Sequence, residues 1–288
     1  MKPLRCPWHR SRALALFALL ACEPGARTQA PPPSETKAPA PAPAPAPAET
    51  PAPELEPPAP AYEEAGGLQY LEIVTGGAKP EDTLPMIIAV HGLGDRPEDF
   101  AGLLEEFPSP ARVILPRALD EHEPGFSWFP IRARSEDVNG LSTGIKAAAD
   151  AIAAHVEAVQ KARPTVGRPI VTGFSQGGML SFTLAAQHPE QFAAAYPVGG
   201  WLPPPLWPTA APASARDNPP VVALHGDDDR ALLIENTRAS VARQRELGYD
   251  VELLEYPGVG HQITLEMRAK LWELLRSAAA REAASAKP

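Results

Sequence analysis

One serine in this sequence stands in a setting suited to nucleophilic chemistry. Ser175 lies in Gly173-Phe174-Ser175-Gln176-Gly177, after the apolar run Ile170–Thr172 and before the helical pattern Met179–Gln187. A strand, a sharp turn and a helix in that order lift a serine hydroxyl above a sheet edge, and the flanking glycines let turn and helix approach closely. The segment predicts a serine nucleophile; the alternative is a glycine-rich connection whose serine is incidental.

A serine hydroxyl needs a base to take its proton and a carboxylate to hold that base. His261 stands before the last helical pattern and is the only histidine after the acidic run Asp227-Asp228-Asp229. That run follows the apolar strand Val221–Leu224 and the pair His225-Gly226. The order Ser, Asp, His is the chain order of α/β hydrolases. The residues alone leave open which aspartate completes the triad.

Short apolar runs separated by helical patterns must position these groups. Such alternation predicts an α/β fold with a mostly parallel central sheet and helices on both faces. The strands are predicted at Leu68–Val74, Met86–Val90, Val113–Leu115, Ile170–Thr172, Val221–Leu224 and Val251–Tyr256.

The helices are predicted from apolar residues that recur every three or four positions. The clearest cases are Ile145–Val159 and a pattern from Ile263 to Leu274, and Pro97–Phe107 is a further candidate. Residues after Ala280 are expected to form a frayed tail.

The composition excludes one class of partner. Against 26 Lys and Arg stand 35 Asp and Glu, a formal net charge of -9. Nucleic acids are bound by concentrated basic surfaces, so no nucleic-acid partner is expected. No spacing of histidines, including His122, suggests a zinc site, and no cofactor is expected.

Residues 1–21 are predicted to be a signal peptide. Basic residues from Lys2 to Arg12 precede the apolar run Ala13–Ala21. The run fits the ~7–15 residues of a signal-peptide core and is shorter than the ~20 residues of a membrane-spanning helix. The leader therefore predicts export.

The leader ends in Leu19-Leu20-Ala21-Cys22, which resembles the lipobox of bacterial lipoproteins. That resemblance implies a lipid on Cys22, attachment to a membrane and a location in the bacterial cell envelope. The alternative is an ordinary signal peptide in which Cys22 is incidental. The only other cysteine is Cys6, so removing the leader leaves no pair for an internal disulfide.

Residues 22–61 are predicted to combine the lipidated Cys22 with a linker, and residues 62–288 to form the hydrolase domain. The linker is dominated by Pro and Ala, as in Ala38-Pro39-Ala40-Pro41. Proline favours extended polyproline II, so the segment is expected to be a semi-rigid spacer with a reach on the order of 100 Å.

Several separated motifs resemble the carboxylesterase, lysophospholipase and acyl-protein thioesterase family of α/β hydrolases. The resemblance extends from about Leu68 to Leu275. Its motifs are His91-Gly92-Leu93-Gly94-Asp95, Ser127-Trp128-Phe129, Gly173-Phe174-Ser175-Gln176-Gly177-Gly178, Trp201-Leu202-Pro203, His225-Gly226-Asp227-Asp228-Asp229 and Gly260-His261.

The resemblance implies hydrolysis of a carboxylic ester through an acyl-enzyme. Its spacing selects Asp229 as the acid, with Asp227 and Asp228 as rivals. The tetrahedral oxyanion needs backbone N–H donors, which map to Leu93 and Gln176. Two departures from the family pattern, Arg230 after the acid and Pro130 after Ser-Trp-Phe, place substrate preference in question more than chemistry.

Trp128 and Trp201 are candidates for binding the acyl part of the substrate, although buried aromatic residues are equally typical of a core. The expected substrate is a small-molecule ester or an acyl lipid. A thioesterase or lysophospholipase with the same triad is the nearest alternative. A third hypothesis is a non-catalytic lipoprotein that binds an envelope partner on a hydrolase scaffold.

Overall fold

The computed structural model describes residues 61–130, 135–214, 216 and 218–285. The signal peptide, Cys22 and residues 23–60 of the linker therefore lie outside the described residues. In the part that is described, one sheet holds eight strands in the order β1-β2-β4-β3-β7-β8-β9-β10. Strands β1, β2 and β4 pair antiparallel, and every pairing from β4 to β10 is parallel.

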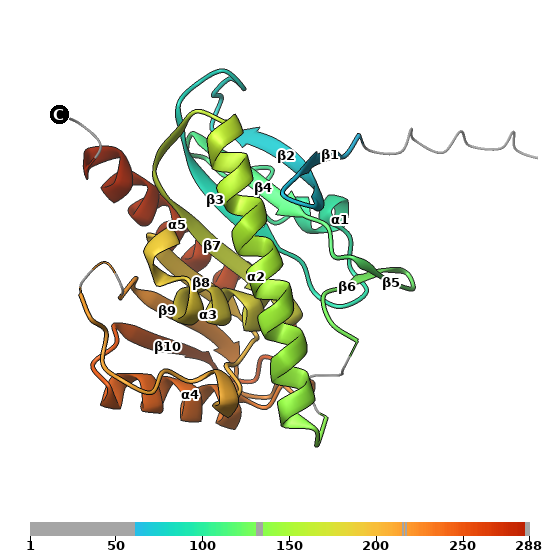
Figure 1. The fold of residues 1–288 in the computed structure, drawn as a ribbon, viewed down its shortest axis with the longest axis vertical. Coiled ribbons are helices and arrows are strands. Elements are labelled where there is room, and N and C mark those ends of the chain that lie inside the picture. The colour runs from blue at the N-terminus through green and yellow to red at the C-terminus, as the bar shows by residue number, and fades with distance from the viewer. Residues whose placement is uncertain (1–60, 131–134, 215, 217, 286–288) are drawn as a thin grey trace, which may run out of the picture. The chain divides into compact units, whose positions relative to one another are not determined.

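The strands of this sheet alternate along the chain with helices, as Figure 1 shows. A separate two-stranded sheet pairs Asp120–His122 (β5) with Gly125–Ser127 (β6). The main strands are Glu63–Ala65 (β1), Leu68–Thr75 (β2), Leu84–Val90 (β3), Ala111–Pro116 (β4), Thr165–Phe174 (β7), Ala194–Val198 (β8), Val221–Gly226 (β9) and Val251–Tyr256 (β10).

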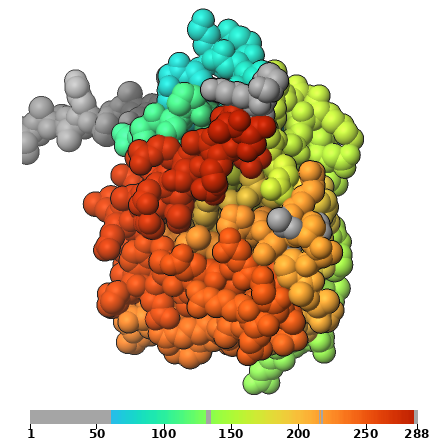
Figure 2. Space-filling view, turned by 90° about the vertical axis from the view of Figure 1, so that its left-hand side faces the viewer, coloured from blue at the N-terminus to red at the C-terminus, as the bar shows by residue number. Residues whose placement is uncertain are grey.

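Helices cover both faces of the sheet, which confirms the predicted fold class. One face carries α2, α3 and α4, and the opposite face carries α1 and α5. Figure 2 looks onto α5 and the neighbouring C-terminal segments. The helices are Pro97–Ala101 (α1), Val138–Ala162 (α2), Gln176–Gln187 (α3), Ile234–Glu246 (α4) and Leu265–Ser285 (α5), with 3-10 turns at Pro189–Gln191 and Pro204–Leu206.

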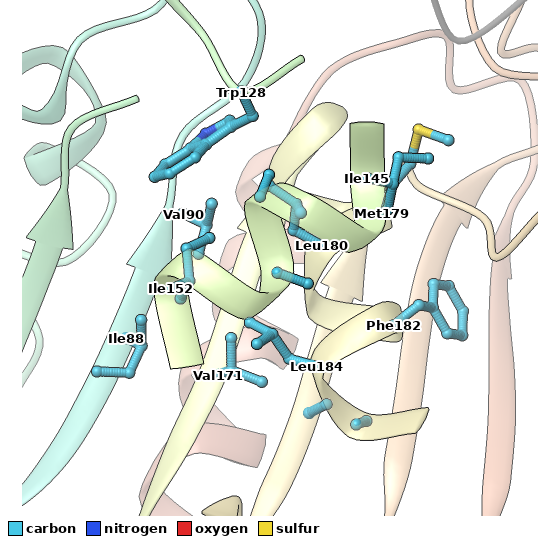
Figure 3. Close-up of a cluster of buried hydrophobic side chains, with 14 of the residues drawn as sticks. Ile88, Val90, Trp128, Ile145, Ile152, Val171, Met179, Leu180, Phe182 and Leu184 are labelled. Atoms are coloured by element: carbon cyan, nitrogen blue, oxygen red, sulfur yellow. The ribbon is translucent and has the colours of Figure 1, made fainter. Parts of the chain in front are cut away.

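Strand β3 shows how the sequence allows a strand to be buried on both faces of the sheet. Its side chains alternate between two apolar clusters: Ile88 and Val90 pack under α2 and α3, whereas Ile87 and Ala89 pack under α1 and α5. Figure 3 shows Ile88 and Val90 facing the helical layer, with Leu180 of α3 nearby. Because successive strand residues point to opposite faces, only an apolar run can be buried on both.

Several elements differ from the sequence expectations. Strand β8 and helix α4 were not predicted, and the β5–β6 hairpin was also missed. The helix expected at Pro97–Phe107 ends at Ala101. The frayed tail expected after Ala280 is wrong as far as Ser285, because α5 continues to that residue and Glu282 Oε2 accepts from the Arg168 N–H at 2.8 Å.

Among residues 61–130, 135–214, 216 and 218–285, no helix combines the length and apolar character that crossing a bilayer requires.

Two buried histidines predict a pH dependence of stability. Burial lowers the pKa of His91 from 6.5 to about 4, and burial lowers the pKa of His155. As pH falls below about 6.5 the unfolded chain binds these protons before the folded protein does, so this stability is present above pH 6.5 and lost toward pH 4. A shift of one pKa unit corresponds to ~1.4 kcal/mol. The free energy of unfolding should therefore fall by about 3 kcal/mol through His91 alone between pH 6.5 and pH 4.

Urea unfolding at pH 7.5 and pH 5 measures this effect as a lower free energy of unfolding at pH 5. His155→Gln removes one of the two titrating groups and should reduce the difference. Equal stability of the parent protein at both pH values would contradict the expectation.

Candidate active site

Ser175 occupies a strained turn between β7 and α3. Its φ of 57° is the only positive φ at a non-glycine position in the described chain. The Ser175 N–H donates to the Val198 carbonyl at 3.0 Å, and its own carbonyl accepts from the Met179 N–H at 3.0 Å. The turn is thus held from β8 and from the first turn of α3. A non-glycine residue in this region costs energy and persists because its surroundings enforce it.

The glycines around Ser175 are required by backbone contacts. A Cβ on Gly177 would lie 1.9 Å from the Val90 carbonyl oxygen. A Cβ on Gly173 would lie 2.5 Å from the Gly177 oxygen. Carbonyl oxygens of the backbone cannot move aside as a side-chain tip can. The close approach predicted from the sequence therefore occurs between β3, β7 and α3.

Three side chains from distant parts of the chain meet at this turn. His261 Nε2 lies 2.9 Å from Ser175 Oγ. His261 Nδ1 lies 2.7 Å from Asp229 Oδ2. The Phe174 ring packs against the His261 imidazole at 4.7 Å between centroids. Ser175 follows β7, Asp229 follows β9 and His261 follows β10, so the carboxyl ends of three parallel strands place all three at one sheet edge.

Asp229 is held as a carboxylate by its hydrogen bonds. Its Oδ1 accepts from the backbone N–H groups of Ala231 and Leu232 at 2.9 and 2.8 Å. Its Oδ2 contacts His261 and also lies 3.2 Å from His225 Nε2. Burial acts to raise the pKa of Asp229, but the hydrogen bonds from His225, His261 and Leu232 outweigh it and hold the pKa below its ordinary value.

The neighbouring aspartates point elsewhere. Asp227 Oδ1 accepts from the Gly258 N–H at 2.6 Å, and Asp228 pairs with Arg230 at 3.3 Å on the exposed surface. Of the three consecutive aspartates, Asp229 is the one that contacts His261. Arg230, a departure from the family pattern, thus directs its guanidinium to Asp228.

Two backbone N–H groups are available beside Ser175. Leu93 follows β3, and its neighbour Gly92 packs against the nucleophile, since a Cβ on Gly92 would lie 3.4 Å from Ser175 Cβ. Gln176 is the first residue of α3, where backbone N–H groups have no partner within the helix. Among the described residues, neither N–H has a protein acceptor in the hydrogen-bond network. Both N–H groups belong to residues that neighbour Ser175 along the chain or in space.

A cleft of about 440 Å³ adjoins these donors and is lined by Leu93, Gln176, Phe129 and the acidic strand β5. A smaller cavity of about 200 Å³ shares Asp120, Phe129 and Pro130 with it and continues between Trp128 and the Gly144–Ala151 face of α2. Together the cleft and the smaller cavity offer space beside Leu93 and Gln176 for one part of a substrate.

The two predicted substrate-binding tryptophans differ in position. Trp128 is only 7% exposed but borders the smaller cavity. Trp201 is also 7% exposed and belongs to the core under α3, and its indole Nε1 has no hydrogen-bond partner among the described residues. The structure places Trp128 on the smaller cavity and does not place Trp201 on either of the two.

The sequence reasoning missed the side-chain role of Gln176. Its Oε1 accepts from the Trp128 backbone N–H at 3.0 Å, and its Nε2 donates to the Phe129 carbonyl at 3.2 Å. The signal available in the sequence was an amide side chain directly after the nucleophile, because an amide can both accept and donate hydrogen bonds. Within the described residues, no group of three or more His, Cys, Asp or Glu side chains could hold a metal ion.

Comparison with known proteins gives the same fold and chemistry. Acyl-protein thioesterase 1 of Gibberella zeae is 28% identical over 212 residues, which are 66% of this chain and 88% of the relative. The structure of esterase PE8 aligns with a TM-score of 0.63 at 21% identity over 73% of this chain and 99% of that chain. Acyl-protein thioesterase 2 of Zea mays aligns with a TM-score of 0.59 at 24% identity and the same coverage.

The structural likenesses show the shared fold, and the family assignment comes from the sequence. Residues 68–278 match the phospholipase/carboxylesterase family. The matched region runs from β2 to most of α5 and includes Ser175. The chain therefore belongs to the phospholipase/carboxylesterase family of α/β hydrolases and is a serine-dependent carboxylic ester hydrolase.

Proposed function

We propose that this protein is an exported, lipid-anchored enzyme that hydrolyses carboxylic esters through an acyl-enzyme on Ser175. The observation that carries the catalytic part is the continuous contact from Ser175 Oγ through His261 to Asp229, at 2.9 and 2.7 Å. A serine joined in this way to a base and a buried carboxylate is the arrangement that acyl transfer requires.

In the first half-reaction, Ser175 Oγ attacks the ester carbonyl carbon while His261 Nε2 takes the hydroxyl proton. Asp229 accepts from the Nδ1–H of the imidazolium that forms. The tetrahedral oxyanion accepts from the Leu93 and Gln176 N–H groups.

Collapse of the tetrahedral intermediate breaks the bond to the alkoxide, which leaves with the proton from His261. A water molecule then repeats the sequence on the acyl-serine and releases the acid.

The leaving group of the substrate distinguishes the candidate reactions. The similarity to an acyl-protein thioesterase over most of its length favours a second candidate, hydrolysis of acyl thioesters by the same residues. A lysophospholipase reaction uses the same steps with a glycerol ester. The cleft beside Leu93 is lined by apolar side chains together with His122 and the acidic residues Asp120 and Glu121, whose carboxylates would repel a phosphate placed there. We therefore favour esters without an anionic group close to the carbonyl.

Kinetics on matched substrates test this choice. Esters and thioesters of equal acyl length, together with a lysophospholipid, are compared by kcat/KM for the full-length protein. The highest value is expected for the simple ester, and a higher value for the thioester would select the second candidate. Labelling by a fluorophosphonate probe tests the non-catalytic alternative, because a scaffold without activity leaves Ser175 unmodified.

The anchor rests on the leader sequence and on the linker composition. Cys22 follows an apolar core and a Leu-Leu-Ala segment, and Pro and Ala dominate the residues up to the first strand. A semi-rigid spacer of this kind suits an enzyme that works at a distance from the membrane that holds it. This supports a location in the bacterial cell envelope.

Cys22→Ser is expected to release the enzyme from membranes into the soluble fraction with its esterase activity retained. Lipid chains contribute roughly 0.8 kcal/mol per buried CH₂, so their loss shifts partitioning strongly. Membrane fractionation of the exported protein with an esterase assay measures this. Cys6→Ser is the matched control and should leave the distribution unchanged. If Cys22→Ser stayed in the membrane fraction, the anchor would be wrong.

A further inference from the structure

We propose that His91 is a positioning residue that holds the Leu93 backbone N–H toward the substrate oxyanion. The inference rests on the proposed function, because it assigns a cause to one of its two oxyanion donors. His91 directly follows strand β3, and its side chain is buried.

The hydrogen bonds of His91 define its tautomer. Its ring is fully buried, and Nδ1 lies 2.7 Å from the Gly92 carbonyl oxygen. A carbonyl oxygen only accepts, so Nδ1 carries a hydrogen and donates it. Nε2 accepts from the Ala118 N–H at 3.2 Å and must therefore be without a hydrogen. The imidazole is thus neutral, with each nitrogen assigned by its partner.

The bond to Gly92 determines where the next N–H points. The Gly92 carbonyl and the Leu93 N–H belong to one planar trans peptide, so they point in opposite directions. The same peptide adjoins the nucleophile, as the 3.4 Å between a Cβ on Gly92 and Ser175 Cβ shows. With its carbonyl tied to the buried ring, the peptide turns its N–H to the other side. Without that bond, rotation of the peptide would present an oxygen acceptor in place of the donor.

The position of the His91 ring is set by Trp128. The indole Nε1 donates to the His91 carbonyl at 3.1 Å, and the two rings pack at 5.2 Å between centroids. Figure 3 shows Trp128 just beyond Val90, at the end of β3. The backbone N–H of Trp128 in turn donates to Gln176 Oε1 at 3.0 Å. One buried network therefore connects the residues that carry both oxyanion donors, Leu93 and Gln176.

Two substitutions separate the bond to Gly92 from the rest of the environment of His91. The amide nitrogen of His91→Asn occupies the place of Nδ1 and can still donate to the Gly92 carbonyl. The amide oxygen of His91→Gln occupies the place of Nε2 and can still accept from Ala118, but the donor to Gly92 is lost. Each variant thus keeps one of the two hydrogen bonds.

Steady-state kinetics and thermal unfolding of both variants test the proposal. His91→Gln should lower kcat by about 10²-fold with little change in KM, which is the effect of removing one oxyanion donor. His91→Asn should lose far less. A purely structural role predicts the reverse or equal losses, in step with the melting temperature, and that pattern would overturn the proposal.

A crystal structure of His91→Gln gives a readout that does not depend on activity. A Gly92–Leu93 peptide rotated so that its oxygen faces Ser175 supports the assignment, and an unchanged peptide contradicts it. The Ser175→Ala protein separates this result from the proposed function. If hydrolysis does not depend on Ser175, the proposed function fails, while the orientation of the peptide still decides the role of His91.

Discussion

Ser175→Ala is expected to lower kcat/KM for ester hydrolysis by about 10³-fold or more. The reason is that His261 Nε2, 2.9 Å from the hydroxyl, would then have no proton to accept and the carbonyl no nucleophile. The fold should be retained, because Ser175 holds its strained turn through its backbone bonds to Val198 and Met179. The measurement is steady-state hydrolysis with circular dichroism to confirm folding.

Ser142→Ala provides a matched control. Ser142 is a buried serine within α2, its hydroxyl donates to the Val138 carbonyl, and among the described residues it makes no hydrogen bond with His261. It should alter activity by no more than a small factor. Activity of purified Ser175→Ala within a few-fold of the parent protein would show that the nucleophile lies elsewhere.

Asp229→Asn is expected to lower kcat/KM by roughly 10³- to 10⁴-fold. The asparagine NH₂ would face His261 Nδ1 at the position where the carboxylate now lies at 2.7 Å. An N–H donor there moves the imidazole proton to Nε2, and that nitrogen can no longer accept from Ser175. If the amide is turned the other way, its NH₂ opposes the backbone N–H groups of Ala231 and Leu232, which now donate to the carboxylate.

The adjacent aspartates supply the controls for this substitution. Asp227→Asn removes a charge that accepts from the Gly258 N–H, and Asp228→Asn breaks an exposed pair with Arg230. Neither reaches His261, so each should cost far less than Asp229→Asn. Exposed ion pairs contribute ~0–1 kcal/mol, so stability should change little in Asp228→Asn. The largest loss in Asp228→Asn would mean that the acid has been assigned one residue too late.

The sequence by itself determined the parts of this protein whose cause is local. A turn between a strand and a helix with glycines two residues before and after its serine requires close packing, and the structure shows this packing at Gly173 and Gly177. The sequence alone therefore predicted the turn that carries the nucleophile. Apolar runs such as Ile170–Thr172 belong to strands because only such runs can be buried on both faces of a parallel sheet. The α/β fold and its family followed from these local signals and from their order along the chain.

Other elements depended on pairing partners that a sequence does not display. Strand β8 reads Ala-Ala-Tyr-Pro-Val, a segment with little strand propensity of its own, and it becomes a strand because β7 and β9 pair with it on both sides. Helix α4 is rich in charged residues, and its narrow buried stripe of Ile234, Thr237, Val241 and Gln244 is defined only by the sheet beneath it.

The detailed site was likewise decided by the tertiary structure. Asp227, Asp228 and Asp229 are chemically identical, and the directions in which their side chains leave the turn after β9 separate them. His91 and His261 are also the same residue type, but the burial of one ring between Trp128 and Ala118 and the position of the other beside Ser175 give them different partners. Residue type determines which hydrogen bonds a side chain can make, whereas only the folded chain decides which partners lie within reach.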